Sequence, residues 1–277
     1  MENQELKPYP SIAQSFGITG IMILCTLIFV PIVFLKDFIG QELSQFLCYV
    51  IPVGITFWIV YIKRKRKTGK KSINISKPDK YIVLLVIIGT LAILHGVTTP
   101  IISIIPMPDF WKKVFLEMAG DSTGVFTFLT IVIAAPVFEE LIFRGIMLEG
   151  LLAKYSPVKS IVVTSILFGI VHLNPWQFVS AFALGLFAGW IFYKTKNLSF
   201  CIIIHATNNL ISFIAGFFVN ESNVDQTMTE YYGGAVNYAL VIIISIAILC
   251  GCILFLKRRF LKKTPTISGD VTQEITF

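Results

Sequence analysis

Long apolar stretches recur along this sequence, and they limit the folds open to it more than any other feature. Eight stretches are candidates for membrane-spanning helices, at residues 14–35, 45–62, 81–104, 124–153, 158–173, 176–193, 199–219 and 235–256. A helix needs about 20 apolar residues to cross the hydrocarbon core of a bilayer. The chain is 55% hydrophobic and only 14% charged, whereas soluble domains are about 25% charged. We therefore expect an all-α fold, a polytopic membrane helical bundle of about eight transmembrane helices.

The candidate helices differ in length, and the segments around them differ in polarity. The stretch 158–173 is short for a bilayer, and 124–153 is long enough to tilt. Residues 106–121 mix aromatic and charged side chains and suit an amphipathic helix on the outer surface. The polar residues 264–277 are expected to form a disordered cytoplasmic tail. No internal repeat is evident, so we expect residues 1–277 to form a single membrane domain.

The net charge of +7 is carried mainly by basic clusters at alternate ends of the candidate helices. The largest are KRKRKTGKK at 63–71 and KRRFLKK at 257–263. If both termini are cytoplasmic, only Lys36, Lys112 and Lys113 of the 23 Lys and Arg residues lie outside. This asymmetry is typical of the positive-inside distribution, and it favours contact with anionic lipid over nucleic-acid binding. We expect a multi-pass cell-membrane protein, and the abundance of Ile, Lys, Phe and Asn indicates a bacterial source.

Two adjacent glutamates, Glu139 and Glu140, lie in the middle of a long apolar stretch. Charge inside a membrane is costly and is usually retained for chemistry, transport or an ion pair. Glu140 and Arg144 are four residues apart, so they share a helix face and can pair. Glu139 lies about 100° round the helix and points elsewhere, unless Arg144 neutralises both carboxylates. Pro136 removes a helix hydrogen bond just before the pair and could open a cavity beside Glu139.

Two further motifs place histidines in the membrane. Phe168 and His172 end the fifth apolar stretch. His205 and Asn209, four residues apart, share a helix face near the start of the seventh. Membrane histidines are often packing residues, and glutamate with histidine also suits the proton relay of a transporter.

The same residue types can hydrolyse a peptide bond in a water-filled membrane cavity. A buried glutamate near a histidine can take a proton from water. A second histidine and Asn209 can donate hydrogen bonds to a developing oxyanion. The set Glu139, His172 and His205 also matches the ligands of zinc hydrolases, although the usual H-E-x-x-H motif is absent.

The motifs EExxxR, FxxxH and HxxxN follow one another between Glu139 and Asn209. In this order, on separate membrane helices, they resemble the CPBP family of intramembrane proteases. That family comprises the CAAX prenyl proteases of the Ras-converting type and bacterial relatives of the Abi group, which are linked to bacteriocin processing and self-immunity. The resemblance implies an eight-helix fold, a catalytic core at about 124–215, and a peptide or membrane-protein substrate.

By motif position, the resemblance implies the catalytic residues Glu139, His172, His205 and Asn209, with structural support from Glu140, Arg144 and Phe168. Glu139 would be the general base, and His172 would position and polarise the water. His205 and Asn209 would stabilise the oxyanion. No cofactor is expected under this mechanism, and the alternative is a zinc ion held by Glu139, His172 and His205.

Two questions follow from this interpretation. A protein that binds a bacteriocin or signalling peptide without cleaving it would carry the same motifs. In addition, the expected topology puts His172 near the outer end of its helix, Glu139 at mid-helix and His205 nearer the inside. For the three to meet, the short fifth helix must lie deep within the protein, or the fourth helix must tilt strongly.

Overall fold

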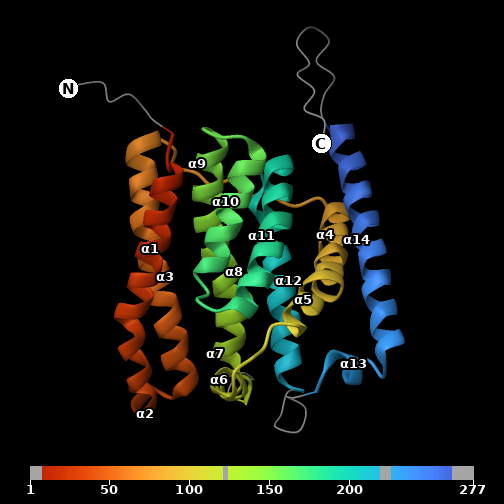
Figure 1. The fold of residues 1–277 in the computed structure, drawn as a ribbon. Coiled ribbons are helices and arrows are strands. Elements are labelled where there is room, and N and C mark those ends of the chain that lie inside the picture. Colours follow the sequence, from red (N-terminus) through yellow and green to blue (C-terminus); the bar gives the residue numbers. More distant parts are fainter. Residues whose placement is uncertain (1–7, 121–123, 219–225, 264–277) are drawn as a thin grey trace, which may run out of the picture.

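The computed structural model describes residues 8–120, 124–218 and 226–263, and these form helices joined by short connections (Figure 1). The helical elements are α1 (Ile12–Phe29), η1 (Val30–Leu35), α2 (Lys36–Ile39), α3 (Gln41–Thr68), α4 (Lys80–Ile93), η2 (Leu94–Thr98), α5 (Thr99–Ser103), α6 (Asp109–Gly120), α7 (Val125–Phe128), η3 (Leu129–Ala134), α8 (Ala135–Glu140), η4 (Leu141–Leu148), α9 (Glu149–Leu152), α10 (Pro157–Ile170), α11 (Pro175–Thr195), α12 (Leu198–Gly216), α13 (Met228–Tyr231) and α14 (Ala235–Lys263).

Seven helical segments within the described residues are long and apolar enough to cross a membrane. They are Ile12–Ile39, Gln41–Thr68, Lys80–Ser103, Val125–Leu152, Pro175–Thr195, Leu198–Gly216 and Ala235–Leu261. The predicted all-α membrane bundle is therefore confirmed, and the protein is a multi-pass membrane protein. The remaining predicted segment, the fifth along the chain, is α10, an apolar helix of 14 residues. Its length of about 21 Å is less than the thickness of the hydrocarbon core of a bilayer.

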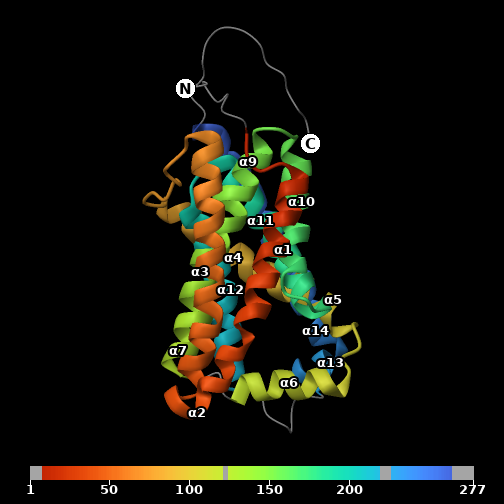
Figure 2. The same ribbon diagram turned by 90° about the vertical axis from the view of Figure 1, so that its left-hand side faces the viewer.

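The long helices form three groups across the bundle (Figure 1). α1 packs against α3 on one side, and α4 packs against α14 on the other. α10, α11 and α12 lie between these pairs with the segment that runs from α7 to α9. The start of α1 and the end of α14 lie at the same end of the bundle, as the positive-inside pattern predicts. α6 lies across the opposite end, where an amphipathic outer helix was expected (Figure 2).

Capping residues determine where α10 begins and where the chain leaves it to begin α11. Ser156 accepts a hydrogen bond from the backbone at the start of the helix, and Pro157 occupies its first turn. Asn174 caps α11 in the same way, with Pro175 at the first position. Leu173 has φ of 56°, a left-handed conformation that turns the chain between the two helices. The hairpin of α10 and α11 therefore turns partway along the bundle (Figure 1).

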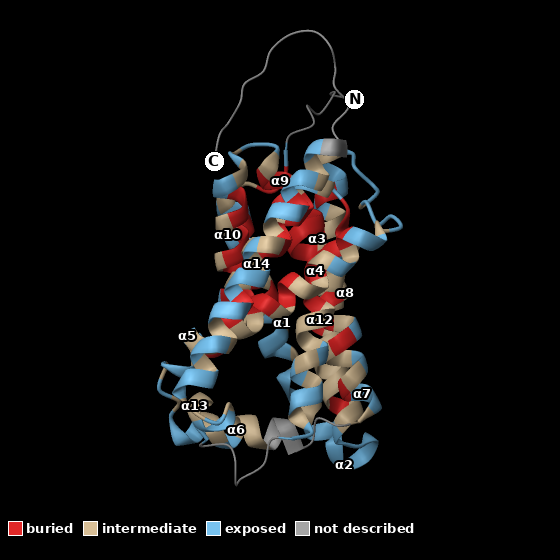
Figure 3. Ribbon diagram, turned by 90° about the vertical axis from the view of Figure 1, so that its right-hand side faces the viewer, coloured by how far each residue is buried: buried red, intermediate tan, exposed pale blue. Residues whose placement is uncertain are grey.

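Most buried residues lie toward the end of the bundle where α1 begins and α14 ends (Figure 3). Several have no exposed surface, including Phe143, Ile146 and Met147 of η4 and Ile204 of α12. The opposite half of the bundle shows mostly exposed and partly buried residues (Figure 3). Tight packing therefore surrounds the segment that follows the two glutamates.

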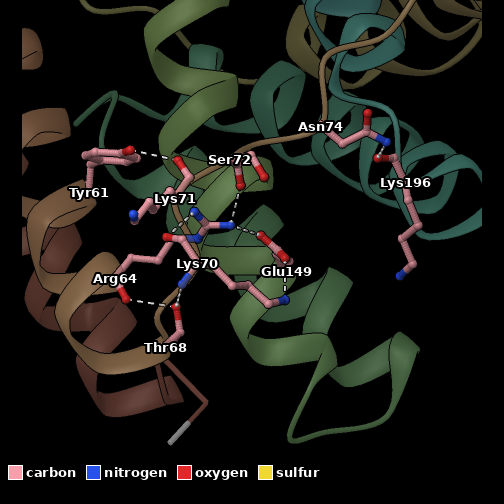
Figure 4. Close-up of polar contacts among 9 residues, drawn as sticks. All are labelled: Tyr61, Arg64, Thr68, Lys70, Lys71, Ser72, Asn74, Glu149 and Lys196. Atoms are coloured by element: carbon pink, nitrogen blue, oxygen red, sulfur yellow. Dashed lines mark hydrogen bonds and ion pairs between the residues drawn. The ribbon is translucent and has the colours of Figure 1, made fainter. Parts of the chain in front are cut away.

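An ion pair between buried Arg64 and half-buried Glu149 joins α3 to α9 (Figure 4). Arg64 is only 2% exposed, and its Nη2 donates to Glu149 Oε2 at 2.7 Å. The same guanidinium donates to the backbone carbonyls of Lys70 and Ser72, and Lys70 Nζ contacts the other oxygen of Glu149 at 2.7 Å. A buried charge needs such partners to offset its desolvation. The loop after α3 is thus held against the bundle.

Candidate active site

The segment that carries the two glutamates is interrupted by π-helical turns, η3 and η4, on either side of α8. In η3 the backbone N–H of Ala135 donates to the carbonyl of Thr130, five residues back. The next residue, Pro136, has no N–H and cannot make the corresponding bond to Ile131. Instead, Asn209 Nδ2 donates to the Ile131 carbonyl at 2.8 Å. The proline expected to disturb this helix therefore leaves a carbonyl that anchors Asn209.

Glu140 pairs with Arg144, as its helical spacing predicts. Arg144 Nη1 lies 2.8 Å from Glu140 Oε1, and both residues are 1% exposed. Among the described carboxylates, Arg144 pairs with Glu140 alone. The alternative, in which Arg144 also neutralises Glu139, is therefore wrong. His205 Nδ1 lies 3.0 Å from the same Glu140 oxygen, a contact that the sequence analysis missed. Glu140 therefore joins its own helix to α12.

The Phe168 ring lies among the charged and aromatic groups of this site. The Arg144 guanidinium lies 4.4 Å above it, a cation–π geometry. The rings of His172 and His205 each meet it edge to face, at 5.4 Å between centroids, and Phe143 does so at 5.0 Å. Phe168 thus contacts both histidines and the Arg144 guanidinium, and its supporting role stays a prediction.

Glu139 is held by a residue that sequence motifs did not identify. Its side chain is 6% exposed, and its Oε1 accepts a hydrogen bond from the Tyr49 hydroxyl at 2.6 Å. No side chain or backbone group in the described part of the chain donates to Oε2, which is buried. Tyr49 belongs to α3, in an apolar stretch whose composition resembles scaffold, so no spacing pattern pointed to it.

A pocket of about 160 Å³ brings Glu139 and His172 together. Tyr49 and Val53 of α3 line it with them. The remaining wall comes from Val171 and Leu173 after α10 and from Met22, Ile23, Thr26 and Leu27 of α1. The walls are mostly apolar, and Glu139, His172 and the Tyr49 hydroxyl are the ionisable groups among them. This is an arrangement in which water and an apolar peptide side chain can be held together.

The depth of His172 follows from the length of its helix. α10 ends at Ile170, partway along the bundle (Figure 1), and His172, two residues later, lines the same pocket as Glu139. His172 Nδ1 lies 2.8 Å from the Phe168 carbonyl. A carbonyl oxygen only accepts, so Nδ1 carries the proton in this bond, and Nε2 is an acceptor in the tautomer that has this single proton. The short helix thus brings His172 to the pocket of Glu139, whereas His205 does not join them there.

The four residues proposed as catalytic do not all meet in this pocket. Glu139 and His172 line it, whereas His205 and Asn209 do not. His205 is turned toward Glu140, and Asn209 is tied to η3. No group of three or more His, Cys, Asp or Glu side chains in the described residues is arranged to hold a metal ion. The alternative zinc set of Glu139, His172 and His205 is therefore not gathered as ligands in this conformation.

Comparison with known proteins bears on the part of the chain that carries the motifs. Residues 121–211 match the family model Rce1-like, described as type II CAAX prenyl endopeptidase Rce1-like. This segment is Rce1-like. The match confirms the resemblance inferred from the three motifs, since it contains all of them, and it implies a protease at the level of the family. No curated protein and no solved structure gave a significant match.

The Rce1-like segment supplies only part of the pocket. Glu139, His172 and the turn after α10 lie within it, whereas α1 and α3 precede it. The wall formed by α1 and the hydrogen bond from Tyr49 therefore come from regions that the family model does not cover.

Proposed function

We propose that this protein is an intramembrane endopeptidase in which Glu139 activates a water molecule for attack on a peptide bond. The observation that carries the proposal is the state of Glu139. It is a buried carboxylate with one oxygen free of protein donors, it is not paired with Arg144, and it shares a pocket with His172. Glu140 also has one oxygen without a partner in the described residues, but it is paired with Arg144 and does not line the pocket.

In the proposed reaction, water is held between Glu139 and Nε2 of His172. Glu139 takes one proton as the oxygen attacks the substrate carbonyl carbon, and a tetrahedral oxyanion forms. The C–N bond then breaks, and the proton passes from Glu139 to the leaving amine. The products are a carboxylic acid and an amine, and the carboxylate of Glu139 is restored.

His205 and Asn209 are proposed to stabilise the oxyanion, under two conditions that the geometry imposes. Asn209 keeps one amide hydrogen after its bond to Ile131. His205 directs Nδ1 at Glu140, so Nε2 can donate only when the ring is protonated. Neither side chain lines the pocket. The oxyanion is bonded to the attacked carbon, so this role requires His205 and Asn209 to approach the pocket when substrate binds.

The substrate class follows from the walls of the pocket. Apolar side chains of α1 and α3 face the reacting groups, which favours an apolar residue next to the scissile bond of a peptide or membrane protein. We also propose that the end of the bundle bearing both termini faces the cytoplasm of a bacterial cell, because the basic residues gather there.

The function can be tested in cells and with purified protein. Peptides released from membranes are compared by mass spectrometry between cells that express the wild type, Glu139→Gln and, as a matched control, Glu230→Gln. Glu230 is exposed and lies outside the site. Cleavage by Glu139→Gln should fall by at least about 100-fold, and Glu230→Gln should match the wild type. Equal products from Glu139→Gln and the wild type would refute the assignment of the base.

Two alternatives are outcomes of the same work. If neither the wild type nor Glu139→Gln cleaves any peptide but both retain one on purification, the protein binds peptides without proteolysis, as an immunity protein would. If a chelator abolishes cleavage by the purified wild type and zinc restores it, the zinc version of the protease replaces the metal-free one.

A further inference from the structure

We propose that Tyr49 is a positioning residue for the general base. Its hydroxyl would hold the carboxylate of Glu139 in one orientation, with Oε2 directed at the reacting water. This inference rests on the proposed function of Glu139, and it assigns a role to a helix that precedes the Rce1-like segment.

The contact between the two side chains is short and well placed. The Tyr49 hydroxyl lies 2.6 Å from Glu139 Oε1, which is typical of an O–H donor bound to a carboxylate. Both residues line the same pocket. The hydrogen bond therefore lies at the wall of the reaction space, where it engages Oε1 and leaves the buried Oε2 without a protein donor.

Within the described part of the chain, Tyr49 is the one donor to this carboxylate. Arg144 and His205 both bind Glu140 instead. A glutamate side chain has three rotatable bonds, so an unrestrained carboxylate beside an open pocket would sample several orientations. A base that is correctly oriented before the reaction lowers the entropy that must be lost in the transition state. Tyr49 is the group in a position to provide that restraint.

The same helix contains a tyrosine with a purely structural contact. Tyr61 lies 12 residues after Tyr49 on α3, and its hydroxyl donates to the Lys71 carbonyl at 2.7 Å. That acceptor is neutral and lies in the loop after α3, away from the pocket (Figure 4). Loss of the Tyr61 hydroxyl removes a hydrogen bond of similar length from the same helix. Tyr61→Phe is therefore a matched control for Tyr49→Phe.

The test measures kcat, KM and thermal stability of the purified protein in proteoliposomes, with a cleaved peptide identified as above. Tyr49→Phe should lower kcat about 10- to 100-fold, the loss expected for one hydrogen bond to a charged group, and leave KM within about twofold. Tyr61→Phe should keep the wild-type kcat. A p-aminophenylalanine placed at position 49 restores an N–H donor and should recover most of the rate.

Each outcome decides the inference. If Tyr49→Phe keeps the wild-type kcat while Glu139→Gln is inactive, the positioning role is wrong and the proposed function stands. If both tyrosine variants lower kcat equally, or Tyr49→Phe changes only KM or stability, Tyr49 is structural. If Glu139→Gln still cleaves the peptide, the proposed function fails, and the role of Tyr49 fails with it.

Discussion

Replacing Arg144 with methionine should destabilise the protein strongly, because it leaves the charge of Glu140 buried without its main partner. Both residues are 1% exposed, and the guanidinium also lies 4.4 Å above the Phe168 ring. Methionine keeps an unbranched chain that suits a helix and removes the charge. His205 would remain as the other described contact of Glu140, at 3.0 Å.

The magnitude can be worked from the geometry. At 2.8 Å and an effective dielectric constant of about 20, the attraction between the two charges is about 6 kcal/mol. Part of that is offset, since methionine needs no desolvation of its own charge. Removal of one partner from a buried pair typically costs about 3–5 kcal/mol. We therefore expect the free energy of unfolding to fall by about 3–5 kcal/mol.

The measurement is reversible unfolding in mixed detergent and SDS micelles, followed by circular dichroism. Glu140→Gln combined with Arg144→Met should be more stable than Arg144→Met alone, because no unpaired buried charge remains. Lys63→Met is the control, since Lys63 is exposed, and substitutions at the surface usually change the free energy of unfolding by about 0.5 kcal/mol or less. A loss below about 1 kcal/mol in Arg144→Met, or a double variant less stable than that single variant, would refute the reasoning.

Two further predictions concern the backbone near the site and the orientation of the bundle. Pro136→Ala supplies an N–H that competes with Asn209 for the Ile131 carbonyl. Because Asn209 would then shift, kcat should fall roughly tenfold or more. An unchanged kcat would show that the position of Asn209 does not depend on this carbonyl. Alkaline phosphatase folds only outside the cytoplasm. A phosphatase fused after Lys263 should therefore be inactive in a bacterial host, and one fused after Gly233 should be active. The opposite pattern would reverse the proposed orientation.

The local parts of the site could be predicted because helical geometry acts over a few residues. Glu140 and Arg144 pair as their spacing requires, and Glu139 is separated from Arg144 as expected. The short length of the fifth apolar stretch was also visible in the sequence. Its consequence, a histidine in the same pocket as Glu139, depended on how the turn after α10 lies against α1 and α3, which composition does not specify.

The contacts that orient the site join residues far apart in the chain. Tyr49 and Glu139 are separated by 90 positions, Asn209 and Ile131 by 78, and His205 and Glu140 by 65. No periodicity relates positions on different helices, because the angle and register at which two helices pack depend on all the side chains between them. The sequence analysis therefore placed His205 with Asn209 and did not identify its bond to Glu140.

The sequence by itself determined that this chain is a membrane helical bundle with one ion pair and one separate glutamate in its fourth long segment. Insertion of a helix into lipid depends on the apolar residues along that helix. Pairing of side chains four residues apart depends on the geometry of one helical turn. Both properties are therefore fixed by residues close together in the sequence. Only the tertiary structure decided which oxygen of Glu139 is engaged, and that α1 and α3 complete its pocket. Those facts depend on the packing of helices whose contacting residues lie far apart in the chain.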